Sequence, residues 1–161
     1  MSEIWQKPEI INWTQIILDS YYQLLGKELI DRNGDELTQA KNLFYADKVV
    51  YSHDTQRDPI YNYSNEKGLK LWEIDWKTLT KTPSRTTTQP LLREERQKLL
   101  EETITKGYMT NYQGIRISST GKKYLIKDIT VWNLQDKNGE FCGQSATFSQ
   151  WENISELTIN N

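Results

Sequence analysis

The residues of this 161-residue chain that could carry acid–base chemistry lie around its single histidine. His53 is the side chain that titrates nearest to neutral pH, so it is the first candidate for a general base, with a hydrogen-bonded structural role as the alternative. Asp58 follows across an expected turn and could orient the imidazole or fix the loop by contacting it. The adjacent Ser52 and Asp54 do not complete a hydrolytic triad, because neighbouring residues of a strand point to opposite faces.

Two arginines are candidates for contacts with an acidic group. Arg116 lies in the middle of the stretch GIRIS. In one interpretation its aliphatic stem covers the sheet and its guanidinium is solvated. In the other, the guanidinium holds an acidic ligand group or pairs with Asp128 on the next strand. Arg85 follows Pro83 and Ser84 and is expected to bond loop carbonyls. Both arginines are therefore candidate ligand-binding residues.

Metal and nucleotide sites are not supported by the residue types present. A structural zinc site needs about four Cys or His ligands, and the chain has one histidine and one cysteine, Cys142. Neither a GxGxxG sequence nor a P-loop occurs. A lone cysteine cannot form an internal disulfide, which fits a reducing compartment, and Cys142 is expected to be a small buried apolar residue.

Composition and charge limit the function further. A net charge of −2 and a pI near 5.5 argue against non-specific nucleic-acid binding. The sequence has no apolar run of membrane-spanning length, and its first ten residues lack the layout of a secretory signal, so we expect a cytoplasmic protein without membrane contact. Six Trp, nine Tyr and three Phe supply buried area for one core of this size.

Helical periodicity is clearest between residues 12 and 25. Asn12 is the expected N-cap and Gly26 the expected end of this helix. The apolar face comprises Trp13, Ile16, Ile17, Tyr21, Leu24 and Leu25. This Trp13–Leu25 helix is expected to pack on the sheet of its own chain, and the alternative is that it forms a homodimer contact.

Further helices are expected over residues 35–44, 65–73, 75–79 and 91–106. Asp35 is the expected N-cap of the first, whose core face would be Leu37, Ala40, Leu43 and Phe44. In the last of them, the residues expected to face the core are Leu92, Leu99, Leu100, Thr103 and Ile104.

A period of two predicts strands at 49–53, 59–63, 108–118, 122–135 and 140–151. In the fourth of these, a bulge near Lys127 and Asp128 would bring both of its apolar pairs to one face. The order of elements predicts an α+β fold with one five-stranded antiparallel sheet and helices on one face, plus the N-terminal amphipathic helix. We expect an arm at residues 1–12, a single domain at 13–151 and a tail at 152–161.

Several stretches in this order resemble the MEKHLA domain, a PAS-related module also found at the end of plant class III homeodomain–leucine zipper proteins. They are SHDTQRDPIYNYSN, TPSR, NYQGIRISSTGKKYLIKD, TVWNLQD and GQSATF, within roughly residues 20–148. The resemblance implies a PAS-like sensor fold in which Tyr51 and Phe148 share a sheet. It also implies a ligand cavity beside the helix after Asn65, with Asn65, Leu69 and Trp72 as lining candidates.

The resemblance does not specify a cofactor. Flavin-binding photoreceptor PAS domains place a reactive cysteine on a helix beside the flavin, whereas Cys142 falls on the last strand. Those domains also have a glutamine two residues after a glycine on that strand. Here Gln144 follows Gly143 directly, so its side chain should face the other way. Tyr112 and Trp132 are expected to be core aromatics, with stacking on a planar ligand as the alternative.

These observations leave three functions open. The first is a non-catalytic sensory or regulatory module that binds a small molecule or a protein partner. No homeodomain or zipper heptads accompany it, so its output would pass through a separate signalling protein. The second is a homodimeric interaction module with a filled core. The third is an enzyme with a small pocket in which His53 and Asp58 act as base and orienting group.

Overall fold

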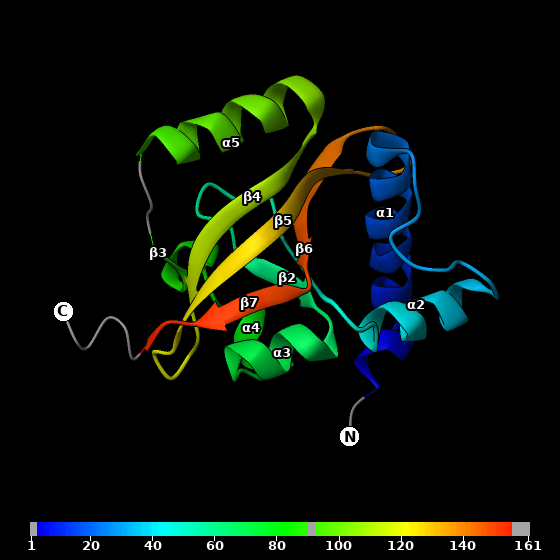
Figure 1. Ribbon diagram of the computed structural model, residues 1–161. Helices are drawn as coiled ribbons and strands as arrows, with labels where there is room; N and C mark the ends of the chain where they lie inside the picture. Colours follow the sequence, from blue (N-terminus) through cyan, green and yellow to red (C-terminus); the bar gives the residue numbers. More distant parts are fainter. Residues whose placement is uncertain (1–2, 90–92, 156–161) are drawn as a thin grey trace.

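The elements of the structure follow the alternation of hydrophobic periods along the chain (Figure 1). The computed structural model describes residues 3–89 and 93–155. Its helical segments are η1 (Ile4–Gln6), α1 (Pro8–Leu25), α2 (Glu36–Phe44), α3 (Glu66–Trp72), α4 (Trp76–Leu79), η2 (Ser84–Thr87) and α5 (Arg93–Lys106). Its strands are β1 (Val49–His53), β2 (Tyr61–Ser64), β3 (Thr88–Gln89), β4 (Tyr108–Ile117), β5 (Lys123–Gln135), β6 (Phe141–Phe148) and β7 (Gln150–Asn153).

The strands form one antiparallel sheet in the order β2-β1-β6-β5-β4-β3, and β7 pairs with β5. The strands β1, β2, β4, β5 and β6 are those expected from the sequence, and β3 and β7 are additional. Val49 pairs with Phe148 across β1 and β6, and the rings of Tyr51 and Phe148 make an edge contact at 6.2 Å between centroids. The front and back halves of the chain therefore share a sheet, as the resemblance implied.

The bulge expected in β5 is present. Tyr112 of β4 faces Ile129 and Gly114 faces Ile126, so β5 holds one extra residue in this interval. Asp128 takes up the excess with a positive φ of 53°. The bulge brings Tyr124, Ile126, Ile129 and Val131 into one buried cluster on the same face, which confirms the prediction.

Helix α1 covers the face of the sheet that we call the outer face. Gly26 ends the helix in the left-handed conformation, as predicted. The predicted start was wrong, because the helix begins at Pro8, whose missing N–H costs nothing at that position, and Asn12 lies inside it. Ile17 and Leu18 are fully buried against the sheet. The apolar stripe thus packs on the sheet of its own chain, as expected, and Trp13, Ile16, Leu24 and Leu25 remain partly exposed.

The opposite face, called here the inner face, is covered by α3, α4, η2 and α5 (Figure 1). Asn65 and Asp75 cap α3 and α4 with their side chains. Along α5, Thr103 is buried and Leu99 is half-buried, but Ile104 is 83% exposed, so its assignment to the core was wrong. Leu92 and the side chain of Leu100 lie outside the described residues.

Both ends of the described chain contact the rest of the domain. Ile4 and Trp5 are buried, Trp5 against Ala40 and Phe44 of α2. Asp35 caps α2 as predicted, but Leu37 is exposed. At the other end, Glu152 pairs with β5 within β7. None of the described helices is long and apolar enough to cross a lipid bilayer.

Candidate functional site

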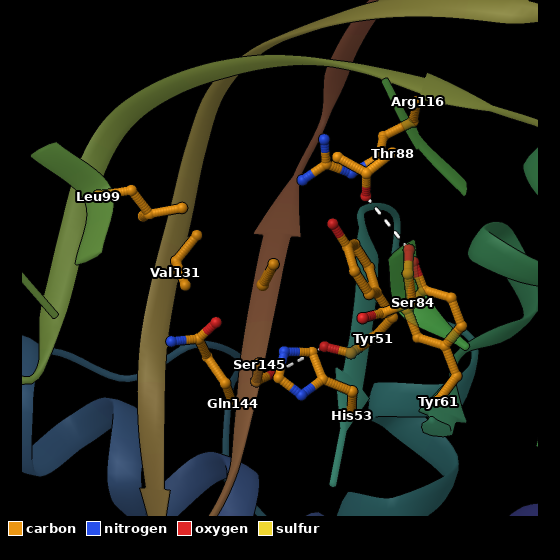
Figure 2. A pocket seen from close by; sticks show the side chains of 11 residues that line it. Tyr51, His53, Tyr61, Ser84, Thr88, Leu99, Arg116, Val131, Gln144 and Ser145 are labelled. Carbon is orange, nitrogen blue, oxygen red and sulfur yellow. Dashed lines mark hydrogen bonds between the residues drawn. The ribbon is translucent and has the colours of Figure 1, made fainter. Parts of the chain in front are cut away.

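A small cavity opens on the inner face between β1, β6 and β4, and Figure 2 shows the side chains around it. Its volume is about 100 Å³. Strand pleating explains part of this lining, because Tyr51 and His53 of β1 face the same side, as do Gln144 and Ala146 of β6. The lining residues are Tyr51, His53, Tyr61, Ser84, Thr88, Leu99, Arg116, Val131, Gln144, Ser145 and Ala146. Three of the residues proposed from the sequence, His53, Arg116 and Gln144, thus meet at one cavity.

Arg116 supplies the formal positive charge of this cavity. The side chain is half-buried, and its Nη1 donates to the carbonyl of Ile115 at 3.3 Å. Tyr51 and Tyr61 lie beside the guanidinium. No described carboxylate lies within ion-pair distance, and Asp128 in particular is not its partner. A guanidinium has five N–H groups, so Arg116 keeps donors for a further acceptor.

Tyr61 is a neutral hydrogen-bonding group beside Arg116. Burial, with a contribution from Tyr51, raises the pKa of Tyr61 to about 12, although Arg116 acts in the opposite direction. The Tyr61 hydroxyl forms a hydrogen bond with Thr87 of η2. At neutral pH no described lining residue supplies a negative charge to offset Arg116. The cavity is therefore electropositive.

His53 lines the cavity but is not paired with Asp58. Its Nδ1 lies 2.9 Å from the carbonyl oxygen of Asp54. Asp58 instead accepts from Nε of Arg85, with distances of 3.0 and 3.1 Å to its two carboxylate oxygens. This ion pair is exposed and outside the cavity, so Arg85 does not bond loop carbonyls as expected. The structure therefore brings together Arg85 and Asp58, not His53 and Asp58.

Gln144 points into the cavity, which corrects the expectation that it faces the other way (Figure 2). Its amide donates to Oδ1 of Asn133 at 3.2 Å. Gln144 and Ala146 share the inner face of β6, and the intervening Ser145 donates to the carbonyl of Tyr51. The direction of Gln144 had been inferred from its distance to the preceding glycine. That inference was wrong because Gly143 packs against His53 and Trp13 and does not mark the cavity side of β6.

A second cavity, of about 290 Å³, lies further along the inner face between α3, α4, η2 and the end of β4. Trp72, the third lining candidate from the resemblance, is one of its walls. Its lining residues are Tyr61, Trp72, Ile74, Thr78, Leu79, Thr82, Thr86, Thr87, Ile117, Ser118 and Ser119. None of them carries a formal charge at neutral pH.

Asn65 has a structural role in place of the expected ligand contact. The side chain is fully buried, and its Oδ1 accepts from the N–H groups of Val50 and Gly68 at 3.1 and 3.2 Å. Its amide nitrogen donates to the carbonyls of Lys48 and Leu43 at 2.7 and 3.3 Å. All four hydrogen-bonding positions of the amide are thus used by the backbone, and none is left for a ligand.

The remaining candidates lie in the core. Trp132 faces the outer side, where its Nε1 donates to the carbonyl of Ile17 at 3.3 Å, so it cannot stack on an inner-face ligand. Tyr112 is buried in the inner cluster and Leu69 packs against it, but neither lines a described cavity. For Tyr112 and Trp132, the interpretation as core aromatics fits this packing.

Sequence reasoning missed several walls of the first cavity. Tyr51 could have been found, since it has the same parity as His53 on β1. Ser84 and Thr88 could not, because the short segment η2–β3 reaches the cavity only through tertiary packing, in which β3 pairs with β4. Leu99 comes from α5, which is distant in sequence from β1.

Comparison with known proteins places this architecture in a family. A family model described as the MEKHLA domain matches residues 11–153. The chain belongs to the MEKHLA family. The search of curated proteins gave no match.

Solved structures with the same fold as this MEKHLA domain include PAS and Light-Oxygen-Voltage (LOV) domains. The PAS domain of a protein from Colwellia psychrerythraea is 17% identical with a TM-score of 0.59, covering 76% of this chain and 99% of that chain. An RNA-binding Light-Oxygen-Voltage receptor is 13% identical with a TM-score of 0.60, covering 82% and 36%. The Aureochrome1 LOV domain in its dark state is 17% identical with a TM-score of 0.53, covering 83% and 100%.

The residues of this MEKHLA domain do not fit the cysteine chemistry of flavin photoreceptors. Its single cysteine, Cys142, packs with the outer cluster toward α1 and lines neither cavity. Burial, together with the charge of Asp136, raises the pKa of this thiol, which makes it a poor nucleophile. Much of the inner face is filled by edge-to-face contacts among Tyr51, Trp72 and Phe148. No thiol of this chain can therefore form an adduct with an inner-face ligand.

Proposed function

We propose that this MEKHLA domain is a non-catalytic sensory or regulatory module that takes a small acid-bearing molecule into the cavity at Arg116. One observation carries the proposal: a half-buried guanidinium without a described carboxylate partner lines a cavity together with His53 and Gln144. Removing a charge from water is costly unless an opposite charge and hydrogen bonds compensate for it. A bound carboxylate would compensate for it with two parallel hydrogen bonds.

The relatives support a sensory or regulatory role. PAS and LOV domains share the fold. Further solved structures that resemble this chain are a LOV domain studied with a flavin analogue and the light-state dimer of the fungal photoreceptor Vivid. In our proposal, occupancy of the cavity changes how the domain interacts with a separate signalling protein. The link to the outer face is short, because Tyr51 lines the cavity while Ser52, the next residue of β1, accepts a hydrogen bond from Trp13 of α1 at 2.9 Å.

The enzyme alternative has less support. No described contact joins His53 to Asp58, and Asp58 is already paired with Arg85. No described nucleophile lies in hydrogen-bond contact with the imidazole. A pocket that combines one guanidinium, one side-chain amide, neutral hydroxyls and an imidazole without a carboxylate partner is suited to holding an acid rather than to transforming it.

The test is a titration of the ¹⁵N-labelled domain with sodium acetate, followed by NMR. We expect saturable shifts at the amides of β1, β4 and β6 around the cavity, strongly weakened in Arg116→Gln. Arg116→Lys should retain only part of the affinity, because a lysine ammonium cannot make the paired contact of a guanidinium. Arg85→Gln is the matched control, since Arg85 lies outside the cavity.

Two results would count against this function. In one, Arg116→Gln and Arg85→Gln respond to acetate as the wild type does. In the other, sodium chloride at equal ionic strength produces the same shifts as acetate. Native mass spectrometry compared with denaturing mass spectrometry adds an independent measurement, which would reveal an acid retained through purification.

A further inference from the structure

The two cavities of the inner face are neighbours that share one wall. Tyr61 lines both of them, and its hydroxyl is hydrogen-bonded to Thr87, which lines the second. Consecutive residues of β4 also divide between them, because Arg116 lines the first and Ile117 the second. The Tyr61–Thr87 pair therefore forms the partition between two spaces that lie side by side.

The sizes of the spaces favour joint use. Small-molecule sites in proteins typically enclose about 300–1,000 Å³. The first cavity, at about 100 Å³, accommodates little more than an acid group, and the second measures about 290 Å³. Each alone falls below the usual range, whereas the two together lie within it.

The chemistry of the two spaces is complementary. The first has the guanidinium of Arg116 and the side-chain amide of Gln144. The second presents the apolar side chains of Trp72, Leu79 and Ile117. Two of its threonines form local hydrogen bonds to the backbone: the hydroxyls of Thr82 and Thr86 donate to the carbonyls of Thr78 and Pro83 at 2.8 and 2.7 Å. With the hydroxyls occupied by backbone, these residues offer mainly methyl groups.

We propose that the two cavities form one bipartite site for a carboxylic acid bearing a ring-sized apolar group. The acid lies on Arg116, the ring lies between Trp72, Leu79 and Ile117, and Tyr61 is the movable partition between them. This inference rests on the proposed function and names its ligand class.

The polar side-chain contacts of the partition are few. The Tyr61 ring is fixed by its hydrogen bond to Thr87 and by an edge contact to Tyr51, with centroids 5.8 Å apart. Thr87 belongs to η2, a segment of four residues without a side-chain cap. A ligand that spans both spaces has to displace this hydrogen bond and shift the Tyr61 ring, which is 3% exposed and packs in the inner cluster. Removing the hydroxyl should therefore favour a long ligand over a short one.

The experiment compares three probes by the same NMR titration: acetate, 3-phenylpropionate and 3-phenylpropan-1-ol. We expect 3-phenylpropionate to bind about 10- to 100-fold more tightly than acetate, from burial of the phenyl ring. The alcohol should bind more weakly than 3-phenylpropionate, because it lacks the charge that meets Arg116. In Tyr61→Phe, the ratio of the affinity for 3-phenylpropionate to the affinity for acetate should rise about two- to tenfold, the worth of one hydrogen bond.

Filling the second space should remove only the benefit of the ring. Thr78→Trp places an indole at its rim on α4, and Ile117→Phe enlarges its wall on β4 if the first variant fails to fold. In either variant we expect the affinity for 3-phenylpropionate to fall to that for acetate. Gln113→Trp, at an exposed position of β4 that lines neither cavity, adds the same bulk and should not alter either probe.

The outcomes separate this inference from the function on which it rests. If acetate binds in an Arg116-dependent manner but the phenyl ring adds no affinity, the bipartite site is wrong and the function stands. The same conclusion follows if Thr78→Trp and Ile117→Phe, both folded, retain the full advantage of the ring. If neither acid binds the wild type, both proposals fail.

Discussion

The two faces of the sheet are built from the same strands but are packed in different ways. On the outer face, α1 buries Ile17 and Leu18 completely, and Trp132 is fully enclosed with its N–H bonded to a carbonyl of the helix. On the inner face, aromatic rings pack beside two cavities, and Arg116 is half-buried without a described carboxylate partner. Neighbouring residues on one strand thus serve opposite purposes.

This difference shows where the fold obtains its stability and where it has given some up. A dry, well-packed face contributes free energy of folding, since filled interiors lose contacts whenever an atom is removed. A cavity and a partly buried charge without a described ion-pair partner do the reverse and persist at functional sites. Substitutions on the two faces should therefore have opposite consequences for stability and binding.

The largest effect is expected on the outer face. Trp132→Ala removes a fully buried ring, its hydrogen bond to Ile17 and its edge contact with Tyr21. We expect the free energy of unfolding to fall by about 3–5 kcal/mol, measured by urea denaturation. The exposed Gln113→Ala should stay within about 0.5 kcal/mol of the wild type. A loss below about 1 kcal/mol in Trp132→Ala would remove the distinction between the faces.

The next effect concerns the junction between α2, β1 and α3. Asn65→Ala leaves two buried N–H groups and two carbonyls without their amide partner. We expect a loss of about 2–4 kcal/mol in urea denaturation. Asp75→Ala, which removes the exposed cap of α4, should cost less than Asn65→Ala. Equal small losses in the two variants would contradict the assignment of Asn65 to structure.

On the inner face, a substitution that removes the Arg116 guanidinium should not lower the free energy of unfolding. Arg116→Met keeps the length of the side chain and removes a partly desolvated charge that has no described ion pair. The free energy of unfolding should be unchanged or rise by up to about 2 kcal/mol, while acetate binding is lost. The melting temperature and the NMR titration together measure both effects.

Arg32 provides the matched control for this reversal. Its guanidinium bonds Asp19 at 2.7 Å, Gln15 at 2.6 Å and Gln39 at 3.0 Å, which joins α1 to α2. Arg32→Met should therefore lower the free energy of unfolding by about 1–3 kcal/mol. A comparable loss in Arg116→Met would show that Arg116 has a structural role.

The smallest effect depends on pH and lies in the turn after β1. Burial acts to raise the pKa of Asp54, but hydrogen bonds from Ile60 and Gln56 outweigh it and leave this pKa below its ordinary value. The ionised carboxylate therefore stabilises the fold above about pH 4, and this stabilisation is lost as the pH falls through the folded pKa. Asp54→Asn should cost at most about 1 kcal/mol at pH 7 and progressively less toward pH 2.

Urea denaturation of both proteins at several pH values measures this difference. A difference that grows as the pH falls would contradict the assignment. His53 contacts the backbone carbonyl of Asp54, and Asp54→Asn keeps that carbonyl. The variant should therefore leave acetate binding at pH 7 unchanged.

The fold could be predicted largely from the sequence because its periods are strong. The bulge at Asp128 followed from the parity of Tyr124, Ile126, Ile129 and Val131, and the left-handed end of α1 followed from Gly26. The predicted first residues of the elements were less accurate. Helix α1 begins at Pro8 because tertiary burial of Ile10 extends it beyond the position at which a polar N-cap would have stopped it.

The candidate site could be predicted only in part. Polarity and local context named His53, Arg116 and Gln144, which meet at the cavity. The same reasoning also named Asn65, whose side chain is hydrogen-bonded to the backbone, and Trp132, which is hydrogen-bonded to α1. A single sequence shows that a polar or aromatic side chain is present, but it does not show whether its hydrogen bonds are used within the fold.

The sequence by itself determined the α+β class, the strand periods, the main helix caps and the MEKHLA family, because these depend on local spacing and on ordered motifs. Tertiary structure decided which face each strand residue meets and which polar groups have partners. It placed Tyr61 between two cavities and brought η2 beside β4. Such contacts join residues far apart in the chain, and pairing at that distance is set by the packing of the whole fold rather than by any local pattern.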